Sequence, residues 1–408
     1  MPERAVVGWD IGGAHVKAAL LRHGRVADAA QWPCPLWQGL DRLDAALDAA
    51  QLRWPELLRH AHAVTMTGEM VDLFAHREDG VTRLAALLAR RLREPLFFGS
   101  DGGWLDASTA GAHWQQIASA NWFATARHAA LVCDAHEGLL IDIGSTTTDL
   151  IAFRPGCVQS TSRSDFERLQ TGELVYQGVV RTPLCALSQR IGWRGVSLNV
   201  MNEFFASAAD VYRLTGELDP GHDQHPSADN APKDVAHTQA RLARMIGLDG
   251  RDGSAADWLA LASEWRRHQC DELSAQVARV AASHALGPSA IVVGAGCGAF
   301  LVPELVPAGW RVLDYGRDVA AVDADAPAAV AAWARVGAPA VAVASLHQQV
   351  EPLGQQRVVV EAAADLDDPH QYCSLWYSDA TATAGAPTRA HAATATGASA
   401  STAATSWP

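Results

Sequence analysis

Two segments of this 408-residue chain repeat one construction, in which an apolar strand ends in Asp-Ile-Gly and a second apolar strand follows. The copies are Ala5–Leu20 and Gly138–Phe153, and they place Asp10 and Asp142 at equivalent positions. Because the residues after each turn have the composition of a strand, both segments are predicted to be β-hairpins. Two copies indicate two related α/β halves with a cleft between them, where small ligands usually bind.

The two turns have the composition of a phosphate site. Glycine lets the backbone approach a ligand closely, and backbone N–H groups and hydroxyls hold phosphate oxygens. Phosphate loops of the Rossmann and Walker types are excluded, because those turns lead into a helix. A plain glycine turn is the alternative for either copy taken alone. The candidate phosphate-binding residues are Gly12, Gly13, Lys17, Gly144, Ser145, Thr146 and Thr147.

Charged residues flank both turns. Asp10 and Asp142 are candidate catalytic residues and candidate ligands of Mg²⁺, held directly or through water. Lys17, on the strand that leaves the first turn, either reaches a phosphate or faces solvent from an edge strand. Asp149 is a candidate general base beside the second turn, and capping of the threonine-rich turn is its alternative role.

A third glycine-rich turn lies in AIVVGAGCGAFL, residues Ala290–Leu301. A strand, a Gly-x-Gly-x-Gly turn and a helix occur in many nucleotide-binding folds and also as plain packing turns. Gly294 and Gly296 are therefore candidate binding residues for a nucleotide or a diphosphate, with packing as the alternative.

The motifs GWDIGGAHVK, LLIDIGSTTTDL and AIVVGAGCGAFL resemble the actin-like ATPase superfamily of sugar kinases, heat-shock chaperones and hydantoinase/oxoprolinase-type proteins. The resemblance implies an α/β fold of the two-domain actin-like ATPase type, a duplicated ribonuclease H-like fold with an interdomain cleft. The expected domains are residues 1–128 and residues 129–346, the second with a helical insertion. Residues 347–408 are expected to be a disordered, low-complexity tail outside the family, since Ala380–Ser406 is almost entirely Ala, Thr, Ser and Gly.

Four further motifs narrow this resemblance. They look like the subfamily of tetrahydromethanopterin-linked one-carbon transfer pathway proteins, which is related to an archaeal enzyme of methanofuran biosynthesis. The motifs are TMTGEMVDLFAHREDGV (Thr65–Val81), SANWFATA (Ser119–Ala126), TGELVYQGVVRTPL (Thr171–Leu184) and MNEFFASAADVYRLTGEL (Met201–Leu218).

The subfamily resemblance implies a transferase of methanofuran or methylofuran biosynthesis. Such an enzyme joins an aminomethylfuran-methyl diphosphate to γ-glutamyltyramine or a related phenol, forms an aryl ether and releases diphosphate. The alternative class is an ATP-dependent small-molecule kinase or a hydantoinase/oxoprolinase-type hydrolase, which would bind ATP with the same loops. A third reading is a noncatalytic partner protein switched by ATP.

Residues in the subfamily motifs are candidate substrate contacts, each with a structural alternative. Arg181 pairs with a phosphate or with a glutamyl carboxylate, or else makes a surface ion pair. Asn121 and Trp122 present an amide and a stacking surface to a furan or phenol ring, or else a buried Trp stands beside a structural Asn.

Three more candidates cluster in Thr65–Val81. Glu69 is a candidate substrate residue, and Asp72 and His76 have the i,i+4 spacing of a metal pair. Without an evident third ligand, helix capping and surface contacts are the alternative to a metal site.

The net charge and the lengths of the apolar runs limit the classes of partner that the chain is expected to bind. A net charge of −13 opposes general nucleic-acid binding. Neither a signal peptide nor an apolar run of the ~18 residues needed to cross a membrane is evident. A cytoplasmic enzyme with small-molecule substrates is expected, and the oligomeric state is left open.

Outside these motifs, the pattern of apolar and polar residues predicts further helices and strands. The expected helices cover Leu40–Leu52, Val81–Leu92, Met201–Leu214, His237–Met245, Ser254–Leu286 and Ala328–Val336. Strands are expected at Pro95–Phe98 and Ile291–Val293, and a loop at His222–Lys233.

Overall fold

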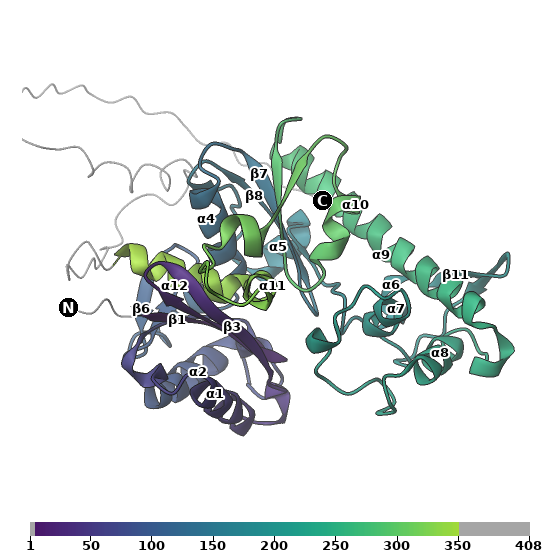
Figure 1. Ribbon diagram of the computed structural model, residues 1–408, viewed down its shortest axis with the longest axis horizontal. Helices are drawn as coiled ribbons and strands as arrows, with labels where there is room; N and C mark the ends of the chain where they lie inside the picture. Colours follow the sequence, from purple (N-terminus) through teal and green to yellow (C-terminus); the bar gives the residue numbers. More distant parts are fainter. Residues whose placement is uncertain (1–4, 351–408) are drawn as a thin grey trace, which may run out of the picture. The chain divides into compact units, whose positions relative to one another are not determined.

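The first six strands form one sheet in the computed structural model, which describes residues 5–350 (Figure 1). Their order across the sheet is β3-β2-β1-β4-β5-β6. The strands are β1 (Val6–Ile11), β2 (His15–Arg22), β3 (Arg25–Pro33), β4 (Ala61–Met66), β5 (Leu96–Phe98) and β6 (Trp104–Asp106).

A second sheet follows in the other half of the chain. Its order is β10-β8-β7-β13-β14, with β9 paired to β8. The strands are β7 (Gly138–Ile143), β8 (Thr148–Arg154), β9 (Cys157–Val158), β10 (Leu174–Val175), β13 (Ile291–Ala295) and β14 (Arg311–Asp314).

The two sheets repeat one pairing pattern. β1 pairs antiparallel with β2 and parallel with β4, while β7 pairs antiparallel with β8 and parallel with β13. Each hairpin therefore stands at the centre of its sheet beside a parallel strand. The duplicated α/β architecture predicted from the sequence is confirmed.

Longer helices cover the sheets and connect their strands. α1 and α2 pack on the face of the first sheet that carries Val7, Trp9 and Ile11. The helices of at least seven residues are α1 (Asp41–Arg53), α2 (Arg77–Arg91), α4 (Asn121–Val132), α5 (Asp165–Thr171), α7 (Ala208–Leu214), α8 (Val235–Arg244), α9 (Ala255–Ser283), α11 (Ala329–Val336) and α12 (Ala338–Val350).

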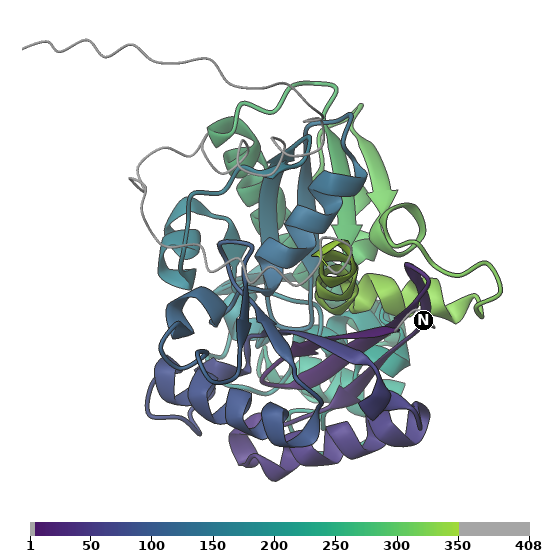
Figure 2. The ribbon, with the colours of Figure 1, turned by 90° about the vertical axis from the view of Figure 1, so that its left-hand side faces the viewer.

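The opposite face of the first sheet is covered by α12, which comes from the far end of the described chain. Figures 1 and 2 show α12, in yellow-green, across the sheet from α1 and α2. Gly8 permits this approach, because a Cβ at Gly8 would lie 1.9 Å from the carbonyl oxygen of Ala340. The expected boundary after residue 346 thus falls inside α12, and residues 351–408 of the expected tail lie outside the described residues.

One hydrophobic core joins the two sheets. It contains Val6 of β1, Leu140 of β7, Ala124 of α4 and Val341 of α12. Side chains alternate along a strand, so Asp10 shares the face of Val6 and Asp142 shares the face of Leu140. Both aspartates therefore stand on the sheet faces that meet at this shared core.

The region between β10 and β13 is mainly helical and has its own core around Trp258 and Trp265. It holds α6 (Leu184–Leu187), α7, α8, α9 and the small sheet of β11 (Arg190–Trp193) and β12 (Val196–Asn199). The expected helix over Met201–Leu214 begins only at Ala208, where Ser207 forms a capping box with Asp210. Among residues 5–350 no single helix is long and apolar enough to span a membrane, whereas α11 and the following helix, bent by 90°, meet that test together.

Candidate functional site

The first hairpin places a carboxylate opposite an amine. Asp10 faces Lys17 across the ladder, and Lys17 Nζ lies 3.5 Å from Asp10 Oδ2. The other oxygen, Oδ1, is buried and has no hydrogen-bond partner among the described residues. Burial raises the pKa of Asp10, and the charge of Lys17 opposes that rise. Lys17 does not lie on an edge strand as one alternative required, because β2 runs between β1 and β3.

The second hairpin places two carboxylates opposite each other. Asp142 faces Asp149, and burial together with Asp149 raises the pKa of Asp142 to about 7. Asp149 is neutralised from outside the hairpin by the buried guanidinium of Arg168 on α5. The structure thus gives Asp149 an ion-pair partner that neither of its expected roles included.

The turns of the two hairpins close in the same way. The N–H of Gly12 donates to the carbonyl of His15 at 2.9 Å, and that of Gly144 donates to the carbonyl of Thr147 at 2.8 Å. These two amides are therefore occupied. The amides of Gly13, Ser145 and Thr146 make no hydrogen bond to protein within residues 5–350, and so they are free for an anion.

The acidic residues of the two hairpins interact with each other. Burial lowers the proton affinity of Lys17, but the charges of Asp10 and Asp142 outweigh it and raise its pKa. Asp10 also contributes to the raised pKa of Asp142. Asp10, Lys17 and Asp142 thus form one electrostatic group, although the hairpins are far apart in sequence.

Arg181 connects the two turns. Its guanidinium donates to Thr146 Oγ1 at 3.5 Å and stacks over the ring of Trp37, with 5.1 Å from Cζ to the ring centroid. Burial lowers its pKa, and no carboxylate in the described part of the chain pairs with it, so the expected surface ion pair is not formed. A partly buried cation without a counter-ion is suited to bind an anion.

Imidazole rings lie on the same side of the first turn. His15 is 4% exposed, and its Nε2 has no hydrogen-bond partner among the described residues. Its ring centroid is 4.6 Å from that of His225, whose Nε2 contacts the carbonyl of Ala14 at 2.8 Å. Burial and nearby positive groups lower the pKa of His15, so its ring is neutral at pH 7 and presents no opposing charge to Arg181.

Glu69 lies on a short 3-10 helix, η3 (Gly68–Met70), beside the first turn. It is buried, and burial raises its pKa to about 7. Its expected neighbours do not join it in a metal site. Asp72 and His76 are exposed; Asp72 precedes α2, and His76 caps that helix by accepting the N–H of Asp79 at 3.2 Å.

No group of three or more His, Cys, Asp or Glu side chains suited to hold a metal occurs within the described range. Mg²⁺ does not require such a cage, because it usually binds one or two carboxylates together with water and substrate phosphates. The unpartnered Oδ1 of Asp10 and the neighbouring Asp142 carboxylate fit that mode of binding.

Asn121 and Trp122 have local partners. The Asn121 side chain accepts the N–H of Trp122 at 2.8 Å. The Trp122 ring is 3% exposed, and the guanidinium of Arg168 stacks over it with 4.5 Å to the ring centroid. In this structure the ring packs against protein rather than presenting an open surface.

The third glycine turn packs against the second hairpin. Gly296 has φ +82°, and a Cβ there would lie 2.2 Å from the carbonyl oxygen of Ile143 and 2.5 Å from Asp142 Oδ1. Gly294 is less constrained, since its Cβ would meet Val302 at 3.4 Å. Gly296 therefore has a packing role, which any ligand role would have to share.

The sequence did not single out Arg168 and Asp165, which lie one helical turn apart on α5 and form an ion pair at 3.3 Å. A signal was present, because Ser164 and Glu167 form the S-x-x-E capping box that starts this helix. The sequence also did not single out Trp37 and His225, because their contacts depend on distant segments.

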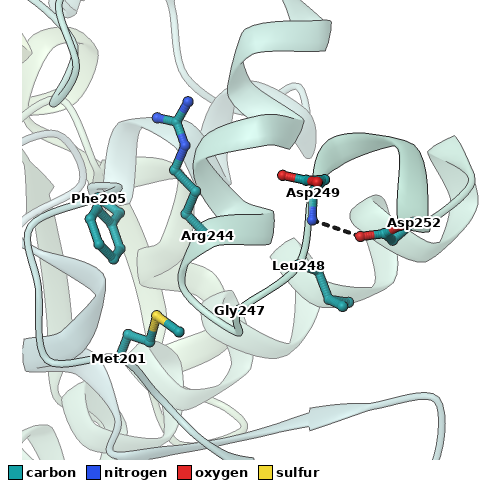
Figure 3. A pocket seen from close by; sticks show the side chains of 7 residues that line it. All are labelled: Met201, Phe205, Arg244, Gly247, Leu248, Asp249 and Asp252. Carbon is teal, nitrogen blue, oxygen red and sulfur yellow. Dashed lines mark hydrogen bonds between the residues drawn. The ribbon is translucent and has the colours of Figure 1, made fainter.

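Two cavities lie away from the hairpins. One, of about 320 Å³, is lined by Met201, Phe205, Arg244 and residues 247–249 and 252, with the Asp249 N–H donating to Asp252 (Figure 3). The other, of about 520 Å³, includes Arg25 and residues 316–322. Neither contains a predicted site residue, so ligand binding in an interdomain cleft stays a prediction.

Known proteins resemble this chain in sequence. The family model described as hydantoinase/oxoprolinase matches residues 60–311. The (4-{4-[2-(gamma-L-glutamylamino)ethyl]phenoxymethyl}furan-2-yl)methanamine synthase of Methanocaldococcus jannaschii is 28% identical over 246 residues, 60% of this chain and 72% of the relative. The protein of the same name from Methanococcus vannielii is 30% identical over 158 residues, 39% of this chain and 70% of the relative.

A solved structure supports the fold. The nucleotide-free structure of acetone carboxylase, from a study of ATP-dependent acetone carboxylation, aligns with a TM-score of 0.52 at 10% identity. The alignment covers 84% of this chain and 70% of that chain. At this identity the likeness concerns the fold alone, which is of the actin-like type.

Proposed function

The chain belongs to the hydantoinase/oxoprolinase family, and from this premise we propose that it is a transferase that forms an aryl ether in the biosynthesis of a methanofuran-type cofactor. The proposed substrates are an aminomethylfuran-methyl diphosphate and γ-glutamyltyramine or a related phenol, and the second product is diphosphate. Support comes from the two archaeal relatives, which both carry the name of the synthase that makes the phenoxymethylfuran product. We expect the reaction to take place in the cytoplasm.

The site residues suit a diphosphate. Free backbone amides at both turns, the hydroxyls of Ser145 and Thr146, and the uncompensated charge of Arg181 all provide donors for phosphate oxygens. Asp10 and Asp142 would hold Mg²⁺, which when bound neutralises the charge that develops on the leaving diphosphate. The charge of Lys17 interacts with both carboxylates and limits their mutual repulsion before the ligand arrives.

The proposed reaction requires little covalent chemistry from the protein. The carbon–oxygen bond between the furanylmethyl carbon and the diphosphate breaks, and its electron pair leaves with the diphosphate. The phenol oxygen forms the new carbon–oxygen bond and loses its proton to a base. The Arg181 guanidinium and the turn amides stabilise the departing anion, while Trp37 beside Arg181 offers a ring surface for the organic part.

One observation carries the proposal most strongly. Arg181 joins Trp37 to the second turn, which carries the free amides of Ser145 and Thr146, and it has no carboxylate partner among residues 5–350. Burial of an unpaired cation is costly, so such a site is suited to bind an anion with several oxygens.

The direct test is incubation of the purified chain with Mg²⁺, the furan diphosphate and γ-glutamyltyramine, followed by mass spectrometry. We expect the aryl ether and free diphosphate, with no ether in Arg181→Met. A parallel incubation with ATP tests the ATP-dependent class. Hydrolysis of ATP, or transfer of its phosphate, without ether formation would overturn the transferase proposal.

Calorimetry with the wild-type chain adds a second discriminator. We expect Mg²⁺-dependent binding of diphosphate and no measurable binding of ATP. Gly296→Val is a poor probe of nucleotide binding, because the valine would collide with the Ile143 carbonyl and with Asp142 whatever the ligand.

A further inference from the structure

Glu69, Ser119 and Asp165 are linked by hydrogen bonds, and the end of this network at Glu69 is buried. Ser119 Oγ lies 3.0 Å from Glu69 Oε1 and 3.0 Å from Asp165 Oδ2. Glu69 is 1% exposed and Ser119 is 6% exposed. These residues come from three segments, η3, the loop before α4, and α5, so the contacts exist only in the folded chain.

The single hydroxyl proton of Ser119 cannot serve both carboxylates. A hydroxyl donates one hydrogen bond and accepts others, whereas an ionised carboxylate only accepts. For both contacts to be hydrogen bonds, one of the two acids must carry a proton and donate it to Ser119. Both contacts of Ser119 are therefore hydrogen bonds only when either Glu69 or Asp165 is protonated.

The charged neighbours indicate which acid carries this proton. Asp165 forms ion pairs with Arg77 of α2 and with Arg168 of its own helix, so two positive charges lie beside it. Glu69 has no ion pair among the described residues, and its Oε2 has no hydrogen-bond partner there. Burial raises the pKa of Glu69 to about 7, with Arg77 and Ser119 opposing and Asp165 adding to the rise.

Neighbours of Glu69 connect it to both hairpins of the proposed site. A Cβ on the preceding Gly68 would lie 3.1 Å from the Ile11 carbonyl oxygen and 3.3 Å from the Gly12 carbonyl carbon, so η3 packs directly on the first turn. On the other side, Asp165 contacts Arg168, which pairs with Asp149 of the second hairpin.

We infer that Glu69 is the acid–base residue of this site, which receives the proton of the acceptor phenol while Ser119 and Asp165 position its carboxyl group. This inference rests on the proposed function. The phenolic O–H bond breaks and the proton bonds to Glu69 Oε2, as the phenol oxygen bonds to the furanylmethyl carbon and the diphosphate leaves with its electron pair. The proton on Glu69 is released to solvent before the next turnover.

Other groups near the hairpins are less suited to this role. Asp149 would have to give up its ion pair with Arg168 in order to take a proton. The lowered pKa of His15 makes its ring a weak base toward a phenol, whose ordinary pKa is about 10. A carboxylate that binds its proton tightly is closer in proton affinity to the phenol than an ordinary glutamate is.

The test compares Glu69→Gln with Glu78→Gln, a matched change at an exposed glutamate of α2. In Glu69→Gln we expect kcat for ether formation to fall about 10²–10⁴-fold, while diphosphate binding by calorimetry is unchanged. The wild-type kcat should rise as the pH increases through about 7, and in Glu69→Gln this rise of kcat with pH should be absent. Glu78→Gln should match the wild type. A wild-type rate and pH profile in Glu69→Gln would overturn the inference.

Two further measurements keep the inference falsifiable if Glu69→Gln fails to fold. Ser119→Ala should shift the pH dependence of kcat by about one unit, because the mutation removes the hydroxyl that is hydrogen-bonded to Glu69. An unshifted pH dependence would overturn the role of the Glu69–Ser119–Asp165 hydrogen bonds. Infrared difference spectra of Asp142→Asn, which lacks the other carboxyl whose pKa is raised to about 7, should show a protonated carboxyl that titrates near 7. An inactive wild-type chain would remove the proposed function, whereas absence of the Glu69 carboxyl band would remove this inference.

Discussion

The two hairpins share a turn and a register but neutralise their aspartates in different ways. In the first, the residue opposite Asp10 is Lys17, so the hairpin contains its own counter-ion. In the second, the residue opposite Asp142 is Asp149, and the cation comes from Arg168 on α5. The first hairpin carries its own counter-ion, whereas the second depends on a helix that must dock before the charge of Asp149 is balanced.

This difference has a functional reading. Burial raises the pKa of both aspartates, but Lys17 opposes the rise at Asp10, whereas Asp149 adds to the rise at Asp142, so Asp142 gains more from a bound cation. The second hairpin is therefore the side on which Mg²⁺ would change the electrostatics most.

Arg168→Met should have the largest effect, because it leaves the buried Asp149 and the partly buried Asp165 without this shared partner. We expect the free energy of unfolding, measured by urea denaturation, to fall by about 3–5 kcal/mol. Arg154→Met, at an exposed position at the end of β8, is the control and should change it by less than about 0.5 kcal/mol. Lys17→Met should lower the free energy of unfolding by less than Arg168→Met does. Equal losses would mean that the second hairpin does not depend specially on α5.

Asp142→Asn should keep the fold and lower Mg²⁺-dependent ether formation about 10²–10³-fold, because it removes charge and leaves the shape nearly unchanged. The measurement is the initial rate of diphosphate release. Asp134→Asn, at an exposed position before β7, should retain the wild-type rate. Wild-type turnover in Asp142→Asn would exclude this carboxylate from the reaction.

The affinity for Mg²⁺ should fall by up to about tenfold for each pH unit below about 7, because a proton on Asp142 competes with the metal. Calorimetry across that range measures this slope. In the metal-free chain the same group acts on stability with the opposite sign. Its raised pKa stabilises the fold at low pH, and this contribution is lost as the pH rises to about 7. If Mg²⁺ affinity and the stability of the metal-free chain changed in the same direction with pH, Asp142 would not be the group responsible for both effects.

Replacing the residue opposite each aspartate should shift pKa values in opposite directions by about one unit or less. Lys17→Met should raise the pKa of Asp10, because it removes a positive charge. Asp149→Asn should lower the pKa of Asp142, because it removes a negative charge. Carboxyl NMR titrations of the metal-free variants measure both, and shifts of the same sign would show that the two hairpins are not electrostatically different.

Local features could be read from the sequence. The hairpins, α1 at Asp41–Arg53 and β5 at Leu96–Phe98 follow from strand composition and helix periodicity within short windows. The placement of Asp10 and Asp142 at equivalent strand ends follows from the repeated motif. The family and fold class predicted from these motifs are confirmed by the family match and the fold.

Contacts between distant segments could not be read in this way. The partner of Asp149 depends on how α5 docks, and the stacking of Arg181 on Trp37 joins segments from different halves of the chain. The i,i+4 spacing of Asp72 and His76 was misleading because the helix begins at Arg77, so the two residues never share a helical face. The roles assigned to the site residues stay predictions.

The position of α12 sets an order for biosynthesis. β1, β2 and β4 leave the ribosome early, but the helix that covers their second face, against Gly8, is made only when residues 338–350 have been translated. Until then the nascent chain carries a sheet with Val6, Ala19 and Leu21 uncovered by this helix. The first half of the protein is thus the first to be made and the last to be completed, and its folding waits for a segment synthesised after the entire second sheet.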